Sequence, residues 1–303
     1  MRRTTIGRRG GSSRKTGNKP GRRVFSRLVV VRNVVKAWAL LVGACALFAL
    51  IGWGLGGYRL LSIFVFCGAL LAGALYWYSD RVVLGLVRAR ELPVGQAPAL
   101  HSTVERLAAV AGVAKPRLYL MDDGLPRALA AGRGPRGSTV ALSSGLLLAA
   151  TPAELEAVVA HELAHVRNRD VVVQTSVAVL AATLLELSRV GGWFSRALLF
   201  FLGPLASAFV HLMLSPKREF VADAVAAAIC DSPHPMADAL VRLDQASELV
   251  SFTGSPATEP LYTINPFMEV GLAALFVTHP PVGERVRRLR ELDPDWREKL
   301  RAA

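Results

Sequence analysis

Two long apolar runs near the start of the chain are the plainest feature of its hydrophobic pattern. Residues 37–58 hold no charged side chain over 22 positions, and residues 60–79 hold none over another 20. Each run is long enough to cross a hydrocarbon core of about 30 Å as a helix, and Gly56-Gly57 offers a tight turn between them. The pattern predicts a transmembrane hairpin over residues 34–79. A cleaved signal peptide, the alternative for the first run, is disfavoured because a second run follows at once. Aromatic residues, which favour the membrane interface, lie at the ends of the runs: Trp53, Tyr58, Trp77 and Tyr78.

The positive charge of the chain is concentrated before its first acidic residue, Asp80. Thirteen of the 36 Lys and Arg residues precede Asp80, and the remaining 23 face 23 Asp and Glu. The positive-inside rule therefore places both ends of the hairpin in the cytoplasm. Residues 1–33 are predicted to form a basic, disordered tail. Residues 1–24 hold almost no apolar side chains, so they cannot bury enough surface to fold. Contact with anionic lipid is a role open to this tail. Nucleic-acid binding is not expected, because interleaved aromatics and a folded frame are lacking.

After Asp80 the pattern becomes that of a folded domain. Residues 97–112 have the apolar spacing of a helix. Thr151-Pro-Ala-Glu154 has the form of a capping box, so a further helix is expected to begin at residue 152. Short β-like segments separated by Gly, Pro and Asp turns predict a small antiparallel sheet, and they cover residues 117–121, 127–131 and 139–142.

Two later apolar stretches, residues 171–185 and 197–216, predict a second transmembrane hairpin. A buried hairpin within the folded domain is the alternative, because the first stretch is short for a span. In both cases the chain returns to the same side of the membrane. The predicted organisation is a tail over 1–33, a hairpin over 34–79, the first part of the folded domain over 80–170, a second hairpin over 171–216 and the second part of the domain over 217–303.

One short motif, His161-Glu162-Leu163-Ala164-His165, carries chemistry. Histidines at i and i+4 project from one face of a helix, so two imidazole nitrogens can converge on a metal. The glutamate lies at the flank of that face, within reach of a water on the metal. Two surface histidines on an ordinary helix are the alternative. It is disfavoured because the preceding helical residues are nearly all apolar, and histidines without a ligand are poorly accommodated there.

A catalytic zinc needs a third protein ligand, and Glu219 is the best candidate. Asp223 follows one helical turn later, where it is able to accept the free N–H of a zinc-binding histidine. Taken alone, the two acids are typical of a solvated helix face, and it is the histidine motif that favours the metal site. No CxxC pair occurs, so a thiolate zinc site is not expected. Three other histidines are weaker candidates: His101, His211 and His234.

Together these motifs resemble the HtpX family of membrane-bound zinc metalloproteases, whose wider relatives include the CAAX prenyl endopeptidases. The likeness covers roughly residues 35–292. It implies an endopeptidase facing the cytoplasm, four membrane spans, one Zn²⁺ per chain, and protein or peptide substrates such as misfolded membrane proteins in quality control. The matching features are the histidine motif with Asn168 and Asp170 after it, Lys217-Arg-Glu219-Phe-Val-Ala-Asp223, Thr278-His-Pro-Pro281 with Arg285, Glu91, Ala97-Pro98, Leu100-His101 and Ser144-Gly-Leu146.

The resemblance also implies roles for particular residues. His161, His165 and Glu219 would hold zinc, and Glu162 would take the proton of the attacking water. His279 is a candidate donor to the developing oxyanion, with Arg285 holding His279 or Glu219 in place. A turn residue at the start of a helix is the alternative for His279.

One segment departs from the family pattern. Family members usually have an Asn-Ala-Phe-Ala-like segment on an edge strand beside the cleft, whereas this chain has Arg127-Ala128-Leu129-Ala130. The strand remains suited to bind substrate through main-chain hydrogen bonds, but Arg127 puts a cation where the family has an amide.

The fold class expected is a mainly α integral membrane protein with a small β-sheet, in which a zincin-like α+β catalytic domain accompanies up to four transmembrane helices. The function expected is zinc-dependent endopeptidase activity at the cytoplasmic side of the cell membrane. The alternatives are a membrane scaffold that keeps the fold without turnover, a CAAX-type prenyl-protein protease, and a transporter-like protein with an accidental motif. The last is disfavoured because neither N-terminal run carries an intramembrane charge.

Overall fold

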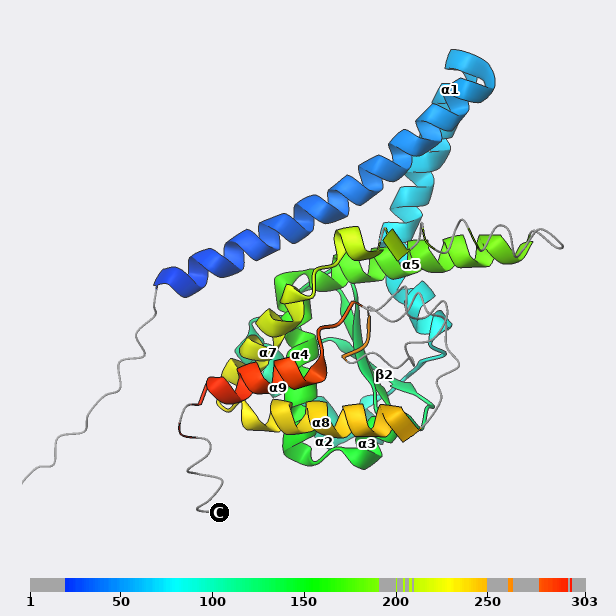
Figure 1. Ribbon diagram of the computed structural model, residues 1–303. Helices are drawn as coiled ribbons and strands as arrows, with labels where there is room; N and C mark the ends of the chain where they lie inside the picture. Colours follow the sequence, from blue (N-terminus) through cyan, green and yellow to red (C-terminus); the bar gives the residue numbers. More distant parts are fainter. Residues whose placement is uncertain are drawn as a thin grey trace, which may run out of the picture.

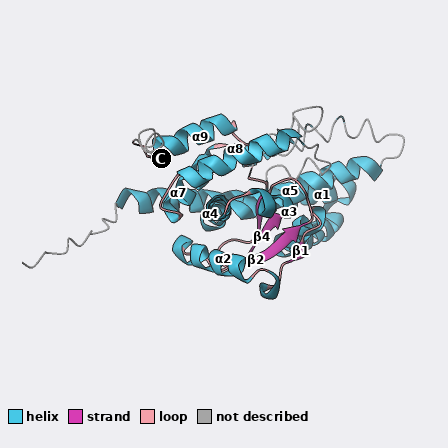
Figure 2. Cartoon of the chain, turned by 90° about the horizontal axis from the view of Figure 1, so that it is seen from below, coloured by secondary structure: helices cyan, strands magenta, loops and turns pink. Residues whose placement is uncertain are grey.

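The computed structural model describes residues 20–190, 210–249, 261–263 and 278–293, together with positions 200, 204, 207, 208 and 295. A long helical hairpin projects from a domain in which helices surround a small sheet (Figure 1). Seen from below, α8 and α9 lie on the opposite side of α4 from α2 and the sheet (Figure 2). The chain is mainly helical, as expected. The described helices outside the hairpin are α2 Pro98–Ala111, α3 Ser144–Ala149, α4 Pro152–Asn168, α5 Asp170–Val190, α7 Lys217–Ile229, α8 His234–Leu249 and α9 Val282–Glu291, with a short 3-10 turn at Val94–Gln96.

The hairpin is a single element, α1 (Pro20–Leu86), broken at Gly56 and Gly57. Gly57 has φ 61° and ψ −147°, a conformation that side chains with a Cβ rarely adopt, and the chain reverses there. Among the residues that the structure describes, one stretch, Gly52–Ala74, is long and apolar enough to cross a membrane. Its apolar side chains are largely uncovered by protein, with Leu55 67% and Phe66 64% exposed.

The start of α1 lies inside the segment predicted as a disordered tail. Residues 20–33 are helical, while residues 1–19 lie outside the described part of the chain. Asn33 is buried where the first arm of the hairpin meets α5. The physical reason is that the apolar pattern of the first arm begins before residue 37, at Val29 and Val30, and a helix propagates at little cost once it is nucleated.

The sheet has four strands in the order β1-β2-β4-β3. β3 (Ala128–Gly132) pairs antiparallel with β4 (Ser138–Ser143), and β1 (Arg90–Glu91) pairs antiparallel with β2 (Arg117–Met121). The three predicted β segments are therefore strands, but the prediction of a wholly antiparallel sheet is wrong, because β2 runs parallel to β4. The short turn after β3 fixes the β3–β4 hairpin locally, whereas the chain between β2 and β3 crosses to the far side of β4. Local sequence does not encode that crossing.

Helix α4 lies at the centre of the domain. Its capping box is formed as predicted: the Thr151 hydroxyl accepts a hydrogen bond from the Glu154 N–H at 3.3 Å, and the Glu154 carboxylate accepts one from the Thr151 N–H at 2.8 Å. Arg242 on α8 donates two further hydrogen bonds to Glu154, at 2.9 and 3.1 Å. The apolar side chains of α4 pack in one core with those of α2, β3 and β4, so α4 is held on several sides.

The first half of α5 is buried in the core of the protein. Val171, Val177, Ala178 and Ala181 are fully buried, and they pack against the other core side chains of the sheet and the first arm of α1. The apolar stretch described here runs over Asp170–Ala182. Most of the predicted second hairpin beyond Val190 lies outside the described residues, so its two spans stay a prediction.

Candidate active site

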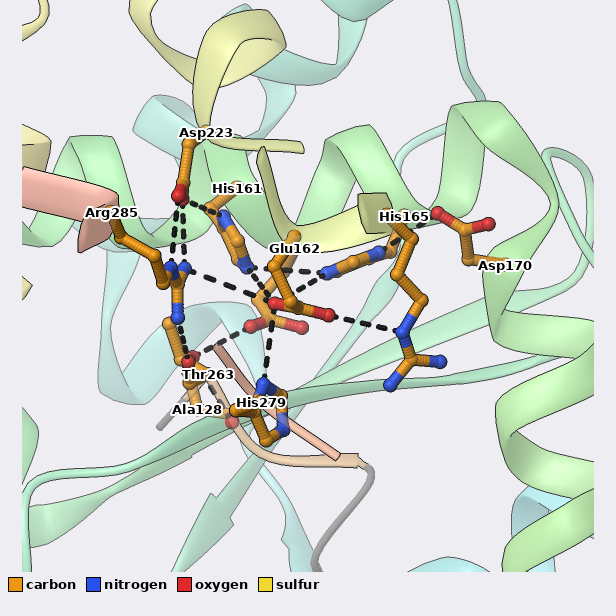
Figure 3. Close-up of polar contacts among 11 residues, drawn as sticks. Ala128, His161, Glu162, His165, Asp170, Asp223, Thr263, His279 and Arg285 are labelled. Carbon is orange, nitrogen blue, oxygen red and sulfur yellow. Dashed lines mark hydrogen bonds and ion pairs between the residues drawn. The ribbon is translucent and has the colours of Figure 1, made fainter. Parts of the chain in front are cut away.

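Three predicted metal ligands meet between α4 and α7. His161 and His165 of α4 and Glu219 of α7 are all buried, and their ligand atoms lie within 4.8 Å of one another. The Nε2 atoms of the two histidines are 3.2 Å apart. The Oε2 atom of Glu219 lies 3.4 Å from the Nε2 atom of His161 and 3.6 Å from the Nε2 atom of His165. Figure 3 shows the two imidazoles directed at one point. The capping box of α4 and the i, i+4 spacing produce this convergence.

A carboxylate lies at the far side of each imidazole. The Nδ1 atom of His161 is 3.0 Å from Asp223, and the Nδ1 atom of His165 is 3.0 Å from Asp170 (Figure 3). A carboxylate at Nδ1 keeps the proton there and leaves the Nε2 lone pair for a metal. The sequence predicts Asp223 in this position, whereas the motif includes Asp170 without indicating a role for it.

The electrostatics of the site favour a cation. Burial alone would raise the pKa of Glu219, but the neighbouring His279 and His165 hold it well below its usual range. Burial alone would likewise lower the pKa of His165, yet Glu219 and Asp170 raise it to about 10. His161 follows the same rule, with its pKa raised by Asp223 and Glu219 against the effect of burial. A divalent metal would take the place of the protons that the histidines otherwise hold.

The donor set fits zinc. Two imidazole nitrogens and one carboxylate are the ligands of many catalytic zinc sites, which leave a fourth position open. Both oxygens of Glu219 are buried, and neither accepts a hydrogen bond within the described part of the chain. The Nε atom of Arg218 lies 3.1 Å from Oε1, whereas Oε2 faces the two imidazoles. A buried acceptor without a hydrogen bond is costly unless a positive charge compensates it, so the residues present match the group that the motif implies.

Arg285 of α9 connects several polar groups next to the metal ligands. It donates two hydrogen bonds to Asp223, at 2.9 and 2.7 Å, and one of 2.6 Å to the main-chain oxygen of Thr263. Burial alone would raise the pKa of Asp223, but Arg285 lowers it to about 2. Arg285 therefore acts on His161 through Asp223, and its contact with Glu219 is longer, at 3.8 Å.

Glu162 and His279 complete the cluster. Glu162 is 1% exposed, and one of its oxygens accepts a hydrogen bond of 2.8 Å from the Thr263 hydroxyl. The Nδ1 atom of His279 lies 3.5 Å from Glu219, so the Thr278-His-Pro-Pro281 segment does reach the site. No sequence pattern indicates a role for Thr263 or for the buried Arg218, whose Nε lies 3.1 Å from Glu219.

The expected substrate strand is β3, and its outer edge is partly occupied. Tyr262 forms an antiparallel bridge with Leu129, and the Thr263 N–H donates a hydrogen bond of 3.3 Å to the Ala128 oxygen. Ala128, Leu129 and Ala130 are buried. Arg127 does not face the metal ligands: its guanidinium pairs with Asp123 and lies 4.8 Å from the centre of the Tyr262 ring.

A buried HExxH helix, a carboxylate ligand on a second helix and a sheet edge beside them define a metallopeptidase. A family model described as peptidase family M48 matches residues 95–293. The chain therefore belongs to peptidase family M48.

Curated relatives named "Protease HtpX homolog" agree with this membership. The protein from Persephonella marina is 35% identical over 280 residues, covering 86% of this chain and 97% of its own. The one from Pelotomaculum thermopropionicum is 34% identical and covers 86% and 99%, and the one from Pyrococcus abyssi is 37% identical and covers 85% and 95%. Among solved structures, S. mikatae Ste24p is similar with 16% identity and a TM-score of 0.47, covering 88% of this chain and 67% of that one.

Proposed function

We propose that this metallopeptidase is a zinc-dependent endopeptidase that cleaves protein substrates at the cytoplasmic face of the cell membrane, in the quality control of membrane proteins. The observation that carries the catalytic part is the convergence of His161, His165 and Glu219 with Glu162 beside them. His161, His165 and Glu219 would hold a single Zn²⁺, which supplies Lewis acidity toward a peptide carbonyl and lowers the pKa of water.

The chain's own residues would do the rest of the chemistry. Glu162 accepts the proton of the attacking water and returns it to the leaving amine. The Thr263 hydroxyl donates a hydrogen bond of 2.8 Å to one oxygen of Glu162, so the other oxygen remains to accept the proton of the water. His279, which is buried beside Glu219, is placed to stabilise negative charge that develops on the substrate oxygen. Asp223, Asp170 and Arg285 hold the two imidazoles in their tautomers.

The proposed membrane arrangement rests on α1. Its two arms reverse at Gly57, and the apolar window Gly52–Ala74 has little protein around it, which suits contact with lipid. The excess of Lys and Arg before Asp80 supports a cytoplasmic position for both ends of this hairpin. We propose that the catalytic domain comprises residues 80–170 and 217–303 on that side, with the basic tail contacting anionic lipid.

The test is the variant Glu162→Gln in the full-length protein, compared with wild type by zinc analysis and by cleavage of an unfolded substrate such as casein. We expect one zinc per chain in both proteins and cleavage only in wild type, because the amide is isosteric with the carboxylate but accepts no proton. Equal cleavage by the two proteins would overturn the role of Glu162. Glu219→Ala serves as the second variant, with loss of zinc as the expected result.

A further inference from the structure

A basic pocket lies at the foot of the hairpin, away from the metal ligands. Its volume is about 740 Å³, within the usual range for ligand sites. Among the described residues, three arginines and no acidic side chain line it. The lining residues are Tyr76, Trp77, Gly112, Val113, Ala114, Arg133, Pro135, Arg136, Gly137 and Arg169, called here the arginine pocket.

The fold gathers the three arginines from two elements. Arg133 and Arg136 lie in the turn between β3 and β4, and Arg169 is the C-terminal cap of α4. The turn is fixed by hydrogen bonds from the Arg133 N–H to Gly137 and from the Ala114 N–H to Pro135, of 2.8 and 2.9 Å. Like charges are thus held together by the backbone, at a cost that an anion would offset.

Arg136 and Arg169 are exposed, and Arg133 is half-buried. Within the described part of the chain none of the three arginines forms an ion pair, and Arg133 Nε is buried without a hydrogen-bond partner. The guanidinium of Arg133 lies 4.3 Å from the centre of the Trp77 ring. Stacking on one face of a guanidinium holds it flat and leaves its N–H edge to bind a phosphate with two hydrogen bonds.

The position of the pocket selects a lipid rather than a free phosphate. Tyr76 and Trp77 follow the apolar window Gly52–Ala74 after one intervening residue, at the depth where aromatic residues meet headgroups. A small cleft of about 50 Å³ adjoins the pocket and shares Tyr76, Arg133 and Arg169 with it. Its other walls are mostly apolar and come from the first arm of α1 and from α5: Asn33, Val34, Ala37, Trp38 and Val172.

We infer that the arginine pocket binds the headgroup of an anionic phospholipid. The phosphate pairs with Arg133, Arg136 and Arg169, and the start of an acyl chain lies along the apolar cleft between the arms of α1. Basic pockets beside transmembrane helices on the cytoplasmic side suit such headgroups. None of the three arginines is a metal ligand, so the test does not need catalytic turnover.

The experiment measures thermal unfolding of the full-length protein in detergent with added lipid. Phosphatidylglycerol is expected to raise the Tm of wild type by mass action, whereas phosphatidylcholine with the same acyl chains is not. Changing Arg133, Arg136 and Arg169 together to Gln should weaken the apparent affinity for phosphatidylglycerol by at least about tenfold. A control with Arg106, Lys115 and Arg287 changed to Gln loses the same charge from exposed ion pairs and should bind as wild type does.

Three outcomes decide the assignment. Wild-type affinity in the pocket variant would overturn it, and so would equal loss in the control, which would indicate only general attraction to charge. Binding of glycerol phosphate as tightly as phosphatidylglycerol would replace the lipid with a soluble phosphate. Should the triple variant fail to fold, Arg136→Glu alone changes an exposed residue at the turn, and its affinity is expected to fall relative to that of Arg287→Glu.

Discussion

Asn33 on the first arm of α1 donates a hydrogen bond of 2.5 Å to Asp170, the residue whose other carboxylate oxygen faces His165. The same side chain donates to the main-chain oxygen of Asn168, at the end of α4, at 3.0 Å. A residue of the α1 hairpin is therefore linked to a predicted metal ligand through one carboxylate. Partners of this kind fix the orientation of the imidazole that a metal needs.

We expect Asn33→Ala to weaken zinc binding several-fold without removing it, because Asp170 would lose the donor that fixes its position. Competition with a chromophoric chelator measures the affinity. Val35→Ala, on an exposed face of the same arm, is the matched control and should bind zinc as wild type does. Unchanged affinity in Asn33→Ala would show that Asp170 is held adequately by other groups.

The Asp223–Arg285 pair should behave as one unit. Asp223→Asn and Arg285→Gln are each expected to lower zinc affinity by about ten- to a hundredfold, because His161 loses its fixed tautomer or the carboxylate loses its support. The double variant should lose little more than either single variant, since both changes break the same link. Zinc affinity across the four proteins tests this, and additive losses would contradict it.

Thr263 is expected to position the general base. Thr263→Val removes the hydroxyl that donates to Glu162, and a hydrogen bond to a charged group is worth about 1.5 kcal/mol, or about tenfold in rate. kcat should fall by about that factor while zinc content stays at one per chain. Thr263→Ser keeps the donor and should restore most of the rate. A serine variant as slow as the valine variant would indicate a packing role instead.

The capping box of α4 predicts an acid dependence of stability. Burial alone would raise the pKa of Glu154, but the hydrogen bonds from Arg242 and Thr151 outweigh it and hold the pKa below the ordinary 4.5. A lowered pKa in the fold means that the ionised carboxylate stabilises the protein above pH 4.5, and that this contribution is lost as the pH falls through the folded pKa.

Glu154→Gln should therefore lower the Tm at neutral pH and show a smaller decrease in Tm than wild type between neutral pH and the acid range. Thr151→Ala, which removes the other half of the box, is expected to cost about 1 kcal/mol of stability. Thermal unfolding across pH measures both. An acid decrease in Glu154→Gln as steep as in wild type would assign the dependence to other groups.

The parts of the site that the sequence predicted are those set by local geometry. The i, i+4 spacing of His161 and His165 and the helical turn between Glu219 and Asp223 determine which side chains share a face, and both relationships occur in the structure. The capping box at Thr151 fixed the start of the helix for the same reason.

The remaining parts depend on contacts between distant segments. Asn33 meets Asp170 across 137 positions, and Thr263 meets Glu162 across 101. A single asparagine or threonine carries no pattern that would reveal such a partner. The parallel pairing of β2 with β4 likewise depends on a crossing that strand propensity does not describe. The sequence predicts a cation at the substrate strand from Arg127, and only the fold shows Arg127 paired with Asp123.

The bridge between Tyr262 and Leu129 means that a segment of the chain itself occupies the edge of β3 where a substrate would bind. A peptide that adds to this edge must replace the bond between Thr263 and Ala128. The internal segment is tethered, so it competes at an effective concentration on the order of millimolar. Under the proposed membrane location, an unfolded segment confined beside the enzyme in the same membrane would compete better with it than a freely diffusing peptide at cellular concentration. If both the internal segment and the substrate segment are held near β3, substrates would be selected by where they are located before their side chains contact the enzyme.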